Sequence, residues 1–261
     1  MEYFGYFASI LIGITLGLIG GGGSILAIPI LVYLFQINPK LATTYSLFIV
    51  GLTAAIGALR HYRMGNIKLK SALLFAFPSV LTIIIVRKII LPIIPETIID
   101  LNGFLLTKDV FIMAFFALLM IAASYSMIKK SKESVDGSAN ATKIIIIGAL
   151  VGIVTGFLGA GGGFLIIPAL LFFTSINMKQ AVGTSLLIIA FNSLFGFLGD
   201  VVNGVVIDYT FLLTIAGFAT VGIFIGTLLS KKIDGVKLKP AFGWFILVMG
   251  IYIISKELFL K

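Results

Sequence analysis

Two clusters of glycine interrupt long apolar stretches of the sequence. The first cluster is Gly20–Ser24, within the apolar run 3–35, and the second is Gly159–Gly163, within the run 144–173. Consecutive glycines break a helix, because each costs about 1 kcal/mol relative to alanine in a helix interior. Inside a bilayer, a broken helix is tolerated where its freed backbone groups face protein or a water-filled cavity. Two such breaks at matching places are typical of the substrate sites of transporters.

The composition is that of a membrane protein. The chain is 60% hydrophobic and 11% charged, whereas a soluble domain averages roughly 25% charged residues. Apolar runs long enough to cross a bilayer recur along the whole length, which predicts a multi-pass protein of the cell membrane. We attribute the net charge of +9 to cytoplasmic loops and not to nucleic-acid binding. Cysteine is absent, and we expect no metal, no cofactor and no catalytic residues.

The sequence repeats itself when it is shifted by 139 positions, so that Gly20 meets Gly159. The shared residues are of types that composition alone does not bring into register. They are Gly13, Gly17, Gly20, Gly22, Gly23, Pro29, Asn38, Lys40, Ala42, Ser46 and Gly57, which meet Gly152, Gly156, Gly159, Gly161, Gly162, Pro168, Asn177, Lys179, Ala181, Ser185 and Gly196. We therefore predict two repeats, 1–128 and 143–261, joined by a polar cytoplasmic linker, 129–142.

Each repeat is predicted to hold a broken hairpin followed by three membrane helices. Asn38 and Asn177 are the expected N-caps of the first of these helices, with Pro39 at the first helical position. The fold class is therefore an all-α polytopic membrane protein with two inverted repeats. The expected elements are hairpin 4–35 with helices 41–59, 71–90 and 109–128, then hairpin 144–174 with helices 180–199, 209–230 and 240–257.

Helix length and loop charge both favour re-entrant hairpins. The arm Ser24–Phe35 would be about 18 Å long, too short for a hydrocarbon core of about 30 Å. If both broken runs return to their starting side, the 19 Lys and Arg residues split 13 to 6 between the two sides. The positive-inside rule then puts both termini outside. Arg87 and Lys88 are exceptions, because they fall on the outer side.

The tips of the two hairpins are the predicted anion site. A helix N-terminus offers unpaired N–H groups and a partial positive charge, and glycine lets a ligand approach the backbone closely. Hydroxyl and amide groups of the helix after each hairpin are expected at the same level. The predicted substrate-binding residues are Gly21, Gly22, Gly23, Ser24, Thr44, Ser46, Gly161, Gly162, Gly163, Thr184, Ser185 and Asn192.

Other interpretations remain open for these residues. The glycines could serve only the close packing of helices, and Ser and Thr often bond to their own helix or to a neighbouring one. His61 is expected in an interfacial loop, and Asp200 near the outer face. No Lys or Arg lies in the middle of a predicted span, so helix ends and neutral donors are expected to balance the anion's charge. The alternative is that Arg60, Arg63 or Arg87 reaches in from an interface and supplies a full charge. A nucleotide site is not indicated, because no Lys-Ser/Thr follows either glycine cluster.

The motif G-x-x-G-x-G-G-G/S is followed by a proline, then by I-N-x-K-x-A and a Ser-Leu pair, in both halves. In these residues the chain resembles the TauE/SafE family of sulfite-exporter-like permeases, over nearly its whole length. The first copy departs from the second at Thr44-Tyr45-Ser46, where the second reads Gly183-Thr184-Ser185. The resemblance implies transport of sulfite, an organosulfonate or another sulfur-containing or organic anion.

We therefore expect a transporter of small anions that works by alternating access, and not an enzyme. Its partners would be a small anion and the lipid bilayer, without nucleic acid. A permease for a small carboxylate or another organic anion is one alternative, and a non-transporting membrane protein is another. The sequence makes no prediction of oligomeric state, coupling ion or direction of transport.

Overall fold

The computed structural model describes residues 2–21, 23–101, 104–128, 141–159, 161–174, 176–230 and 235–259. This part of the chain is almost entirely helical, as the sequence predicts. In the first half the elements are α1 (Glu2–Ile19), α2 (Gly23–Pro29), the π-helix η1 (Ile30–Leu34), α3 (Pro39–Arg63), α4 (Leu69–Ile85), the π-helix η2 (Val86–Ile90), α5 (Leu91–Ile93) and α6 (Lys108–Ile128). In the second half they are α7 (Ala141–Leu158), α8 (Gly163–Phe173), α9 (Met178–Val202), α10 (Tyr209–Leu229) and α11 (Gly235–Phe259).

The helices begin close to where the sequence places them. Asn38 caps α3, because its Oδ1 accepts a hydrogen bond of 2.8 Å from the Leu41 amide, and Pro39 occupies the first turn. Asn177 caps α9 in the same way through the amide of Gln180, at 2.9 Å. Both predicted N-caps are thus confirmed, and they fix the start of the two helices that cross the centre of the molecule.

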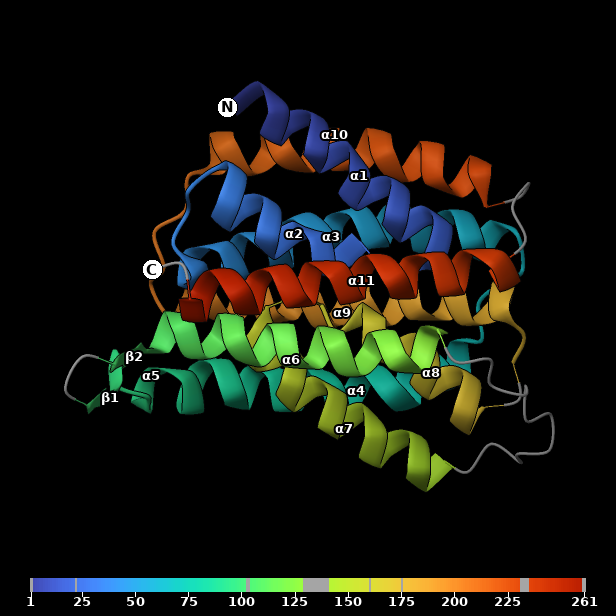
Figure 1. Ribbon diagram of the computed structural model, residues 1–261. Coiled ribbons are helices and arrows are strands. Elements are labelled where there is room, and N and C mark those ends of the chain that lie inside the picture. The colour runs from blue at the N-terminus through green and yellow to red at the C-terminus, as the bar shows by residue number, and fades with distance from the viewer. Residues whose placement is uncertain are drawn as a thin grey trace.

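Each glycine-broken run packs against a helix of the other half. Figure 1 shows α1 beside α10 and α7 beside α4. A Cβ atom on Gly13 would overlap the Ala219 carbonyl of α10, and one on Gly152 would overlap the Ser79 carbonyl of α4. Gly13 and Gly152 are equivalent in the sequence repeat, so the two halves use the same close, glycine-mediated packing. The helices α3 and α9 cross between these pairs, and α6 packs on α11.

The first broken run turns back toward its own beginning. The ring of Phe35, after η1, lies 5.3 Å from that of Tyr6 between centroids. In Figure 1, α1 begins and η1 ends at the left-hand end of the molecule, whereas α7 begins and α8 ends at the right-hand end. α1 begins and α11 finishes on the left-hand side of the molecule in Figure 1.

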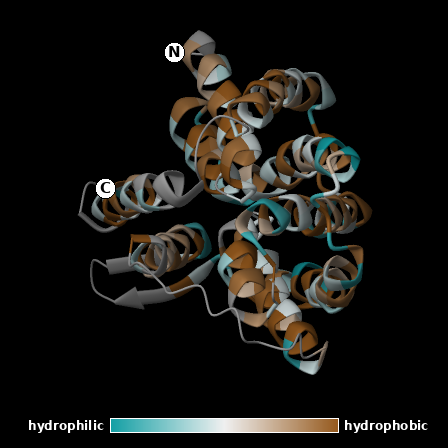
Figure 2. Cartoon of the chain, turned by 90° about the vertical axis from the view of Figure 1, so that its right-hand side faces the viewer, coloured by the Kyte–Doolittle hydropathy of each residue, from teal (hydrophilic) through white to brown (hydrophobic). Residues whose placement is uncertain are grey.

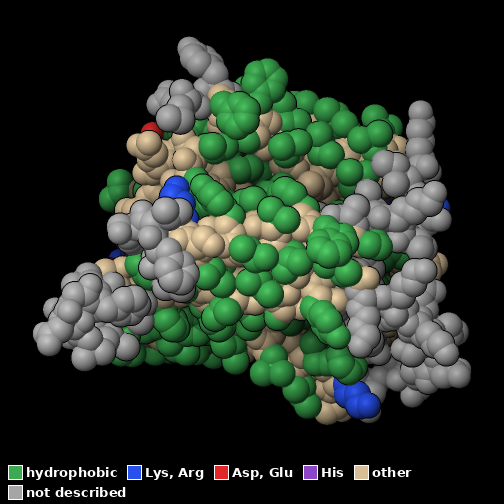
Figure 3. Space-filling view, in the orientation of Figure 1, with side chains coloured by type: hydrophobic (Ala, Val, Ile, Leu, Met, Phe, Trp, Pro, Cys, Tyr) green, Lys and Arg blue, Asp and Glu red, His purple; other side chains and the backbone are tan. Residues whose placement is uncertain are grey.

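The outer surface of the helix assembly is apolar. Phe77 of α4 is 73% exposed and Val248 of α11 is 63% exposed. Hydrophobic residues surround the assembly when it is seen along the helices (Figure 2), and hydrophobic side chains cover the middle of the face in Figure 3. Such a surface fits lipid rather than water.

Among the described residues, six helices are long and apolar enough to cross a membrane, by length and composition. They are 39–63, 69–93, 108–125, 141–158, 178–202 and 209–229. The sequence did not predict the short antiparallel pair β1 (Thr97–Leu101) and β2 (Phe104–Thr107) between α5 and α6. The chain is therefore a multi-pass membrane protein with one small β-hairpin at an end of the helix assembly.

Candidate functional site

The two glycine breaks meet inside the molecule. A Cβ atom on Gly21 would overlap the Gly163 carbonyl, and one on Gly163 would lie 2.7 Å from the Gly21 Cα. The breaks rest on equivalent positions of the crossing helices: a Cβ on Gly20 would lie 2.8 Å from the Val182 Cα, and one on Gly159 would lie 2.8 Å from the Thr43 Cα. Two segments far apart in sequence thus form one buried junction between α3 and α9.

Left-handed backbone shapes this junction. Gly20 and Gly159 have φ angles of +78° and +63°, and each amide bonds to the carbonyl four residues earlier, at Leu16 and Thr155. Gly161 and Gly162 also have positive φ, +66° and +68°. A left-handed residue with a side chain costs roughly 1–2 kcal/mol. The local fold therefore requires glycine at these positions, and a helix restarts at Gly163.

Buried polar atoms without a hydrogen-bond partner in the described part of the chain lie beside the junction. A Cβ on Gly161 would lie 2.5 Å from the Ser193 Oγ, and one on Gly162 would overlap the Thr155 Oγ1. Both hydroxyls lack a partner, as do the Ser46 Oγ and the Asn192 Oδ1, and all four side chains are at most 1% exposed. Ser193 and Thr155 were not predicted from the sequence, since nothing distinguished them from ordinary helix residues.

The other predicted site residues divide between the junction and its surroundings. Ser24 donates to the Gly21 carbonyl at 2.8 Å, and Ser185 donates to the Gly20 carbonyl at 3.0 Å, so both belong to the first tip. Gly23 packs on α1 near Leu16. Thr184 instead accepts a bond from the Lys68 amide, at 3.0 Å, beside the start of α4. Gly22 lies outside the described residues.

Asn192 donates from its Nδ2 to the Ser79 Oγ of α4 at 2.8 Å. The Ser79 hydroxyl can donate as well as accept, so the amide can also bind it through its oxygen and present its NH₂ group elsewhere. The side chain is fully buried. Asn192 is therefore a polar group that can serve either an anion or its own helix contact.

A buried ion pair lies beside the second tip. Arg87, in η2, donates from Nε to the Asp200 Oδ1 at 2.7 Å and from Nη2 to the Asp200 Oδ2. Its Nη1 donates to the Gly156 carbonyl of α7 at 3.2 Å, and its Nη2 also reaches the hydroxyls of Thr43 and Thr44. Thr44, a predicted site residue, donates to the Asp200 Oδ2 at 2.6 Å. One guanidinium thus joins η2, α3, α7 and α9.

The structure buries three titratable side chains at this cluster and at its counterpart. Arg87 is 3% exposed and Asp200 is 5% exposed. Arg87 places a full positive charge within the candidate span 69–93, near the end of that span. One expectation from the sequence, a loop position for His61, is wrong. His61, which the repeat aligns with Asp200, is 4% exposed within α3 and not in a loop.

The two ends of the crossing helices therefore differ. Where Asp200 binds Arg87 at one end, His61 lies against Gly183 at the other, 3.0 Å from a Cβ placed there. Neither ring nitrogen of His61 has a hydrogen-bond partner among the described residues. The sequence repeat itself carried this signal, because His61 and Asp200 break its symmetry.

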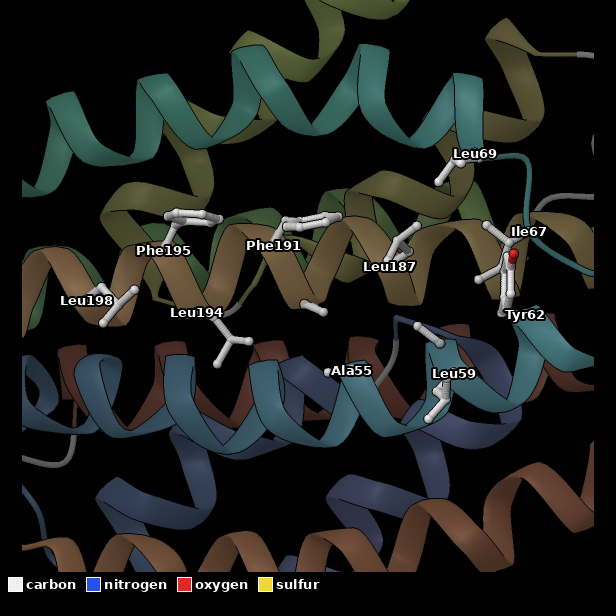
Figure 4. A pocket seen from close by; sticks show the side chains of 12 residues that line it. Ala55, Leu59, Tyr62, Ile67, Leu69, Leu187, Phe191, Leu194, Phe195 and Leu198 are labelled. Carbon is white, nitrogen blue, oxygen red and sulfur yellow. The ribbon is translucent and has the colours of Figure 1, made fainter.

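A separate groove runs between α3 and α9 on the outside of the molecule (Figure 4). Its volume is about 540 Å³. Its lining is apolar, from Ala55 and Leu59 on α3 to Leu187, Phe191 and Phe195 on α9. Apart from the hydroxyl of Tyr62, the lining offers an anion no hydrogen-bonding side chain, so the groove suits an apolar group better than an anion.

Comparison with known proteins agrees with this architecture. The sequence profile of the family described as "Sulfite exporter TauE/SafE" matches residues 6–253. A "Probable membrane transporter protein" of Xylella fastidiosa (strain 9a5c) is 32% identical over 250 residues, covering 95% of this chain and 92% of that protein. The "Probable membrane transporter protein YdhB" of Bacillus subtilis (strain 168) is 30% identical over 233 residues, covering 88% and 91%.

A "Probable membrane transporter protein" of Haemophilus influenzae is 26% identical over 271 residues, covering 94% of this chain and 95% of that protein. The span matched by the family profile, 6–253, extends across both halves of the chain. With the family profile matched over nearly its whole length, the chain belongs to the TauE/SafE family of membrane transporters.

Proposed function

We propose that this transporter carries small oxyanions, sulfite or an organosulfonate, and binds them at the junction of the two glycine breaks. The observation that carries the proposal is the presence of buried hydroxyls without partners, Ser193 and Thr155, directly beside Gly161 and Gly162. A buried hydroxyl without a partner costs free energy, so such groups are retained where a ligand binds them. The name of the family supports a sulfur oxyanion as that ligand.

The mechanism that we propose is alternating access. The junction lies between two broken runs that enter from opposite ends, and a site at the interface of two repeats can be exposed to either side when they rock. The close contact of Gly21 and Gly163 must open by a small movement to admit an anion. This contact also serves packing, so the glycines have a structural role together with the binding role.

Flux through proteoliposomes tests the proposal. Purified protein would be reconstituted, and uptake of sulfite, ethanesulfonate, acetate and phosphate would be measured. We expect the sulfur oxyanions to be carried in preference to phosphate. Preferential uptake of acetate would favour the carboxylate permease instead, and absence of flux for all four anions would contradict transport of this class.

Two serine variants test the location of the site. Ser193→Ala and Ser46→Ala remove hydroxyls that have no hydrogen-bond partner among the described residues, so they break no hydrogen bond in that part of the chain. We expect unchanged thermal stability and weaker anion uptake. Ser124→Ala is the matched control, because Ser124 is also buried but donates to the Ile121 carbonyl of its own helix, α6. Equal uptake in all three variants would place the site elsewhere.

A further inference from the structure

The guanidinium of Arg87 binds the Asp200 carboxylate with two parallel donors, Nε and Nη2, which we call the Arg87 fork. The same pair of donors can bind two oxygens of any planar or tetrahedral oxyanion. The Arg87 Nε and Nη2 face the Asp200 Oδ1 and Oδ2 side-on, and the Thr44 hydroxyl donates to the same Oδ2 at 2.6 Å. Such a fork recognises carboxylate, sulfonate and phosphate oxygens alike. The donors of Arg87 and Thr44 therefore form an oxyanion site, and the carboxylate of Asp200 occupies it.

The cluster touches the second glycine break. The Gly156 carbonyl, in the last turn of α7, accepts from the Arg87 Nη1 at 3.2 Å. Gly159, at the end of that turn, packs on Thr43, whose hydroxyl accepts from the Arg87 Nη2 at 3.3 Å. Arg87 also lies in a π-helix, η2, a distortion that is frequent at functional sites. An anion at the junction is thus next to this arginine.

Charge balance decides how an anion can reach Arg87. The pair is neutral while Asp200 is ionised, and a second negative charge there would be buried without a partner, which is strongly unfavourable. A proton on Asp200 removes that charge and leaves the Arg87 fork free. The anion then forms the neutral pair with Arg87, and the proton leaves Asp200 when the carboxylate returns.

We propose that Asp200 is a tethered substitute for the transported oxyanion on Arg87, and that each anion displaces it together with one proton taken up by Asp200. This rests on the proposed function and makes the protein a proton-coupled carrier of sulfonate-type anions. Thr44 donates to whichever anion occupies the fork. Arg87 is then a binding residue, and Asp200 is the coupling residue.

The groups around Asp200 agree with this role. Arg87 of η2 forms its ion pair, Thr43 and Thr44 come from α3, and the Gly156 carbonyl faces Arg87 from α7. The other charged side chains of these elements are exposed or have partners elsewhere. Lys40 pairs with Glu96 at 3.4 Å, and Arg60 donates to the Thr227 Oγ1 at 2.6 Å. The exposed ones are Arg63, Lys88, Lys143 and Lys179.

Proton uptake on binding tests the proposal directly. Ethanesulfonate stays ionised near neutral pH, so any proton taken up on binding is bound by the protein and not by the anion. The purified full chain in detergent would be titrated with ethanesulfonate by calorimetry, in two buffers of different ionisation enthalpy. We expect wild type to take up about one proton per anion bound, and Asp200→Asn to take up none while still binding the anion.

Two further variants complete the design. Asp208→Asn changes an exposed carboxylate that caps α10 by accepting from the Phe211 amide, so it should take up the same number of protons as wild type. Arg87→Lys keeps the charge but loses the fork, and should bind ethanesulfonate about tenfold more weakly. Size-exclusion chromatography confirms that each variant is folded before titration.

The outcomes separate this inference from the proposed function. Proton uptake that persists in Asp200→Asn, or anion binding by wild type without proton uptake, overturns the role of Asp200. If wild type carries ethanesulfonate into vesicles without taking up protons on binding, transport stands and the coupling is wrong. If it binds ethanesulfonate with a proton but carries none, the Arg87 site stands and the transport proposal is wrong.

Discussion

A Cβ atom on Gly163 would lie 2.7 Å from the Cα atom of Gly21, so the two broken runs touch backbone to backbone. Because no side chain fits there, the junction can be widened or closed only by moving whole helices, not by turning a side chain. A substitution that adds a single Cβ at a glycine break should therefore alter transport. Glycines elsewhere in the chain, where a Cβ meets nothing, serve as controls.

Gly161→Ala should stop or strongly reduce anion flux. The alanine would have to adopt a left-handed backbone conformation, which costs roughly 1–2 kcal/mol. Its Cβ would lie 2.5 Å from the Ser193 Oγ, so the serine side chain must move. Gly204→Ala is the control, because Gly204 has φ +83° but nothing within 4 Å of its Cβ. Both variants share the cost of a left-handed alanine, and Gly161→Ala also displaces the Ser193 hydroxyl. Only Gly161→Ala should lose flux, and equal flux in both would argue against a site at this tip.

Gly222→Ala should destabilise the packing of α1 on α10. Its Cβ would overlap the Ile10 carbonyl, and such overpacking costs about 1–3 kcal/mol. Gly217→Ala, in the same helix, meets nothing within 4 Å and should be neutral or stabilise by up to about 1 kcal/mol through helix propensity. Thermal unfolding in detergent measures both, and equal melting temperatures would show that α1 and α10 do not pack this closely.

Arg87 and Asp200 should be strongly coupled in stability. Arg87→Met or Asp200→Leu alone leaves a buried charge without its partner, which costs about 3–5 kcal/mol. The double variant removes both charges and should be more stable than either single variant. Denaturation of all four proteins measures the coupling energy, and additive effects of the two substitutions would contradict the buried pair.

The orientation in the membrane can be tested on this cysteine-free chain. We predict both termini outside and the linker 129–142 cytoplasmic. Val206→Cys, between α9 and α10 and 87% exposed, should react with an impermeant thiol reagent in intact cells. Val135→Cys should react only after the membrane is opened, and its labelling from outside would exclude the predicted orientation.

The positions of the helices and their caps follow from the sequence, because Asn38, Pro39 and Asn177 act locally. The contact between the glycine breaks was also foreseeable, since a repeat with two broken runs brings equivalent segments together. The caps depend on residues that are near in sequence, and the contact between the breaks depends on residues that the repeat relates. The β1–β2 hairpin was missed because it occurs in one half only, outside the repeated pattern.

The Arg87–Asp200 pair could not be predicted in this way. Its members come from different halves, and the repeat aligns Arg87 with Gly226 and Asp200 with His61, so symmetry gives no indication of the contact. Loop charge placed Arg87 on the outer side of the membrane and gave no partner for it. A pair of opposite charges near the ends of two apolar helices was the available signal, and only the packing of α4 on α9 turns it into a buried ion pair.

The exchange of partners between the halves has a consequence for biosynthesis. The first broken run packs on α10, which begins at Tyr209, so it leaves the ribosome long before its partner exists. At synthesis rates of about 5–20 residues per second, the glycine-lined face of α1 waits for roughly 10–40 seconds with lipid or the insertion machinery as its neighbour. The second broken run packs on α4, which is already in place when α7 is made. Of the two broken runs, the amino-terminal one is thus completed second, although it is synthesised first.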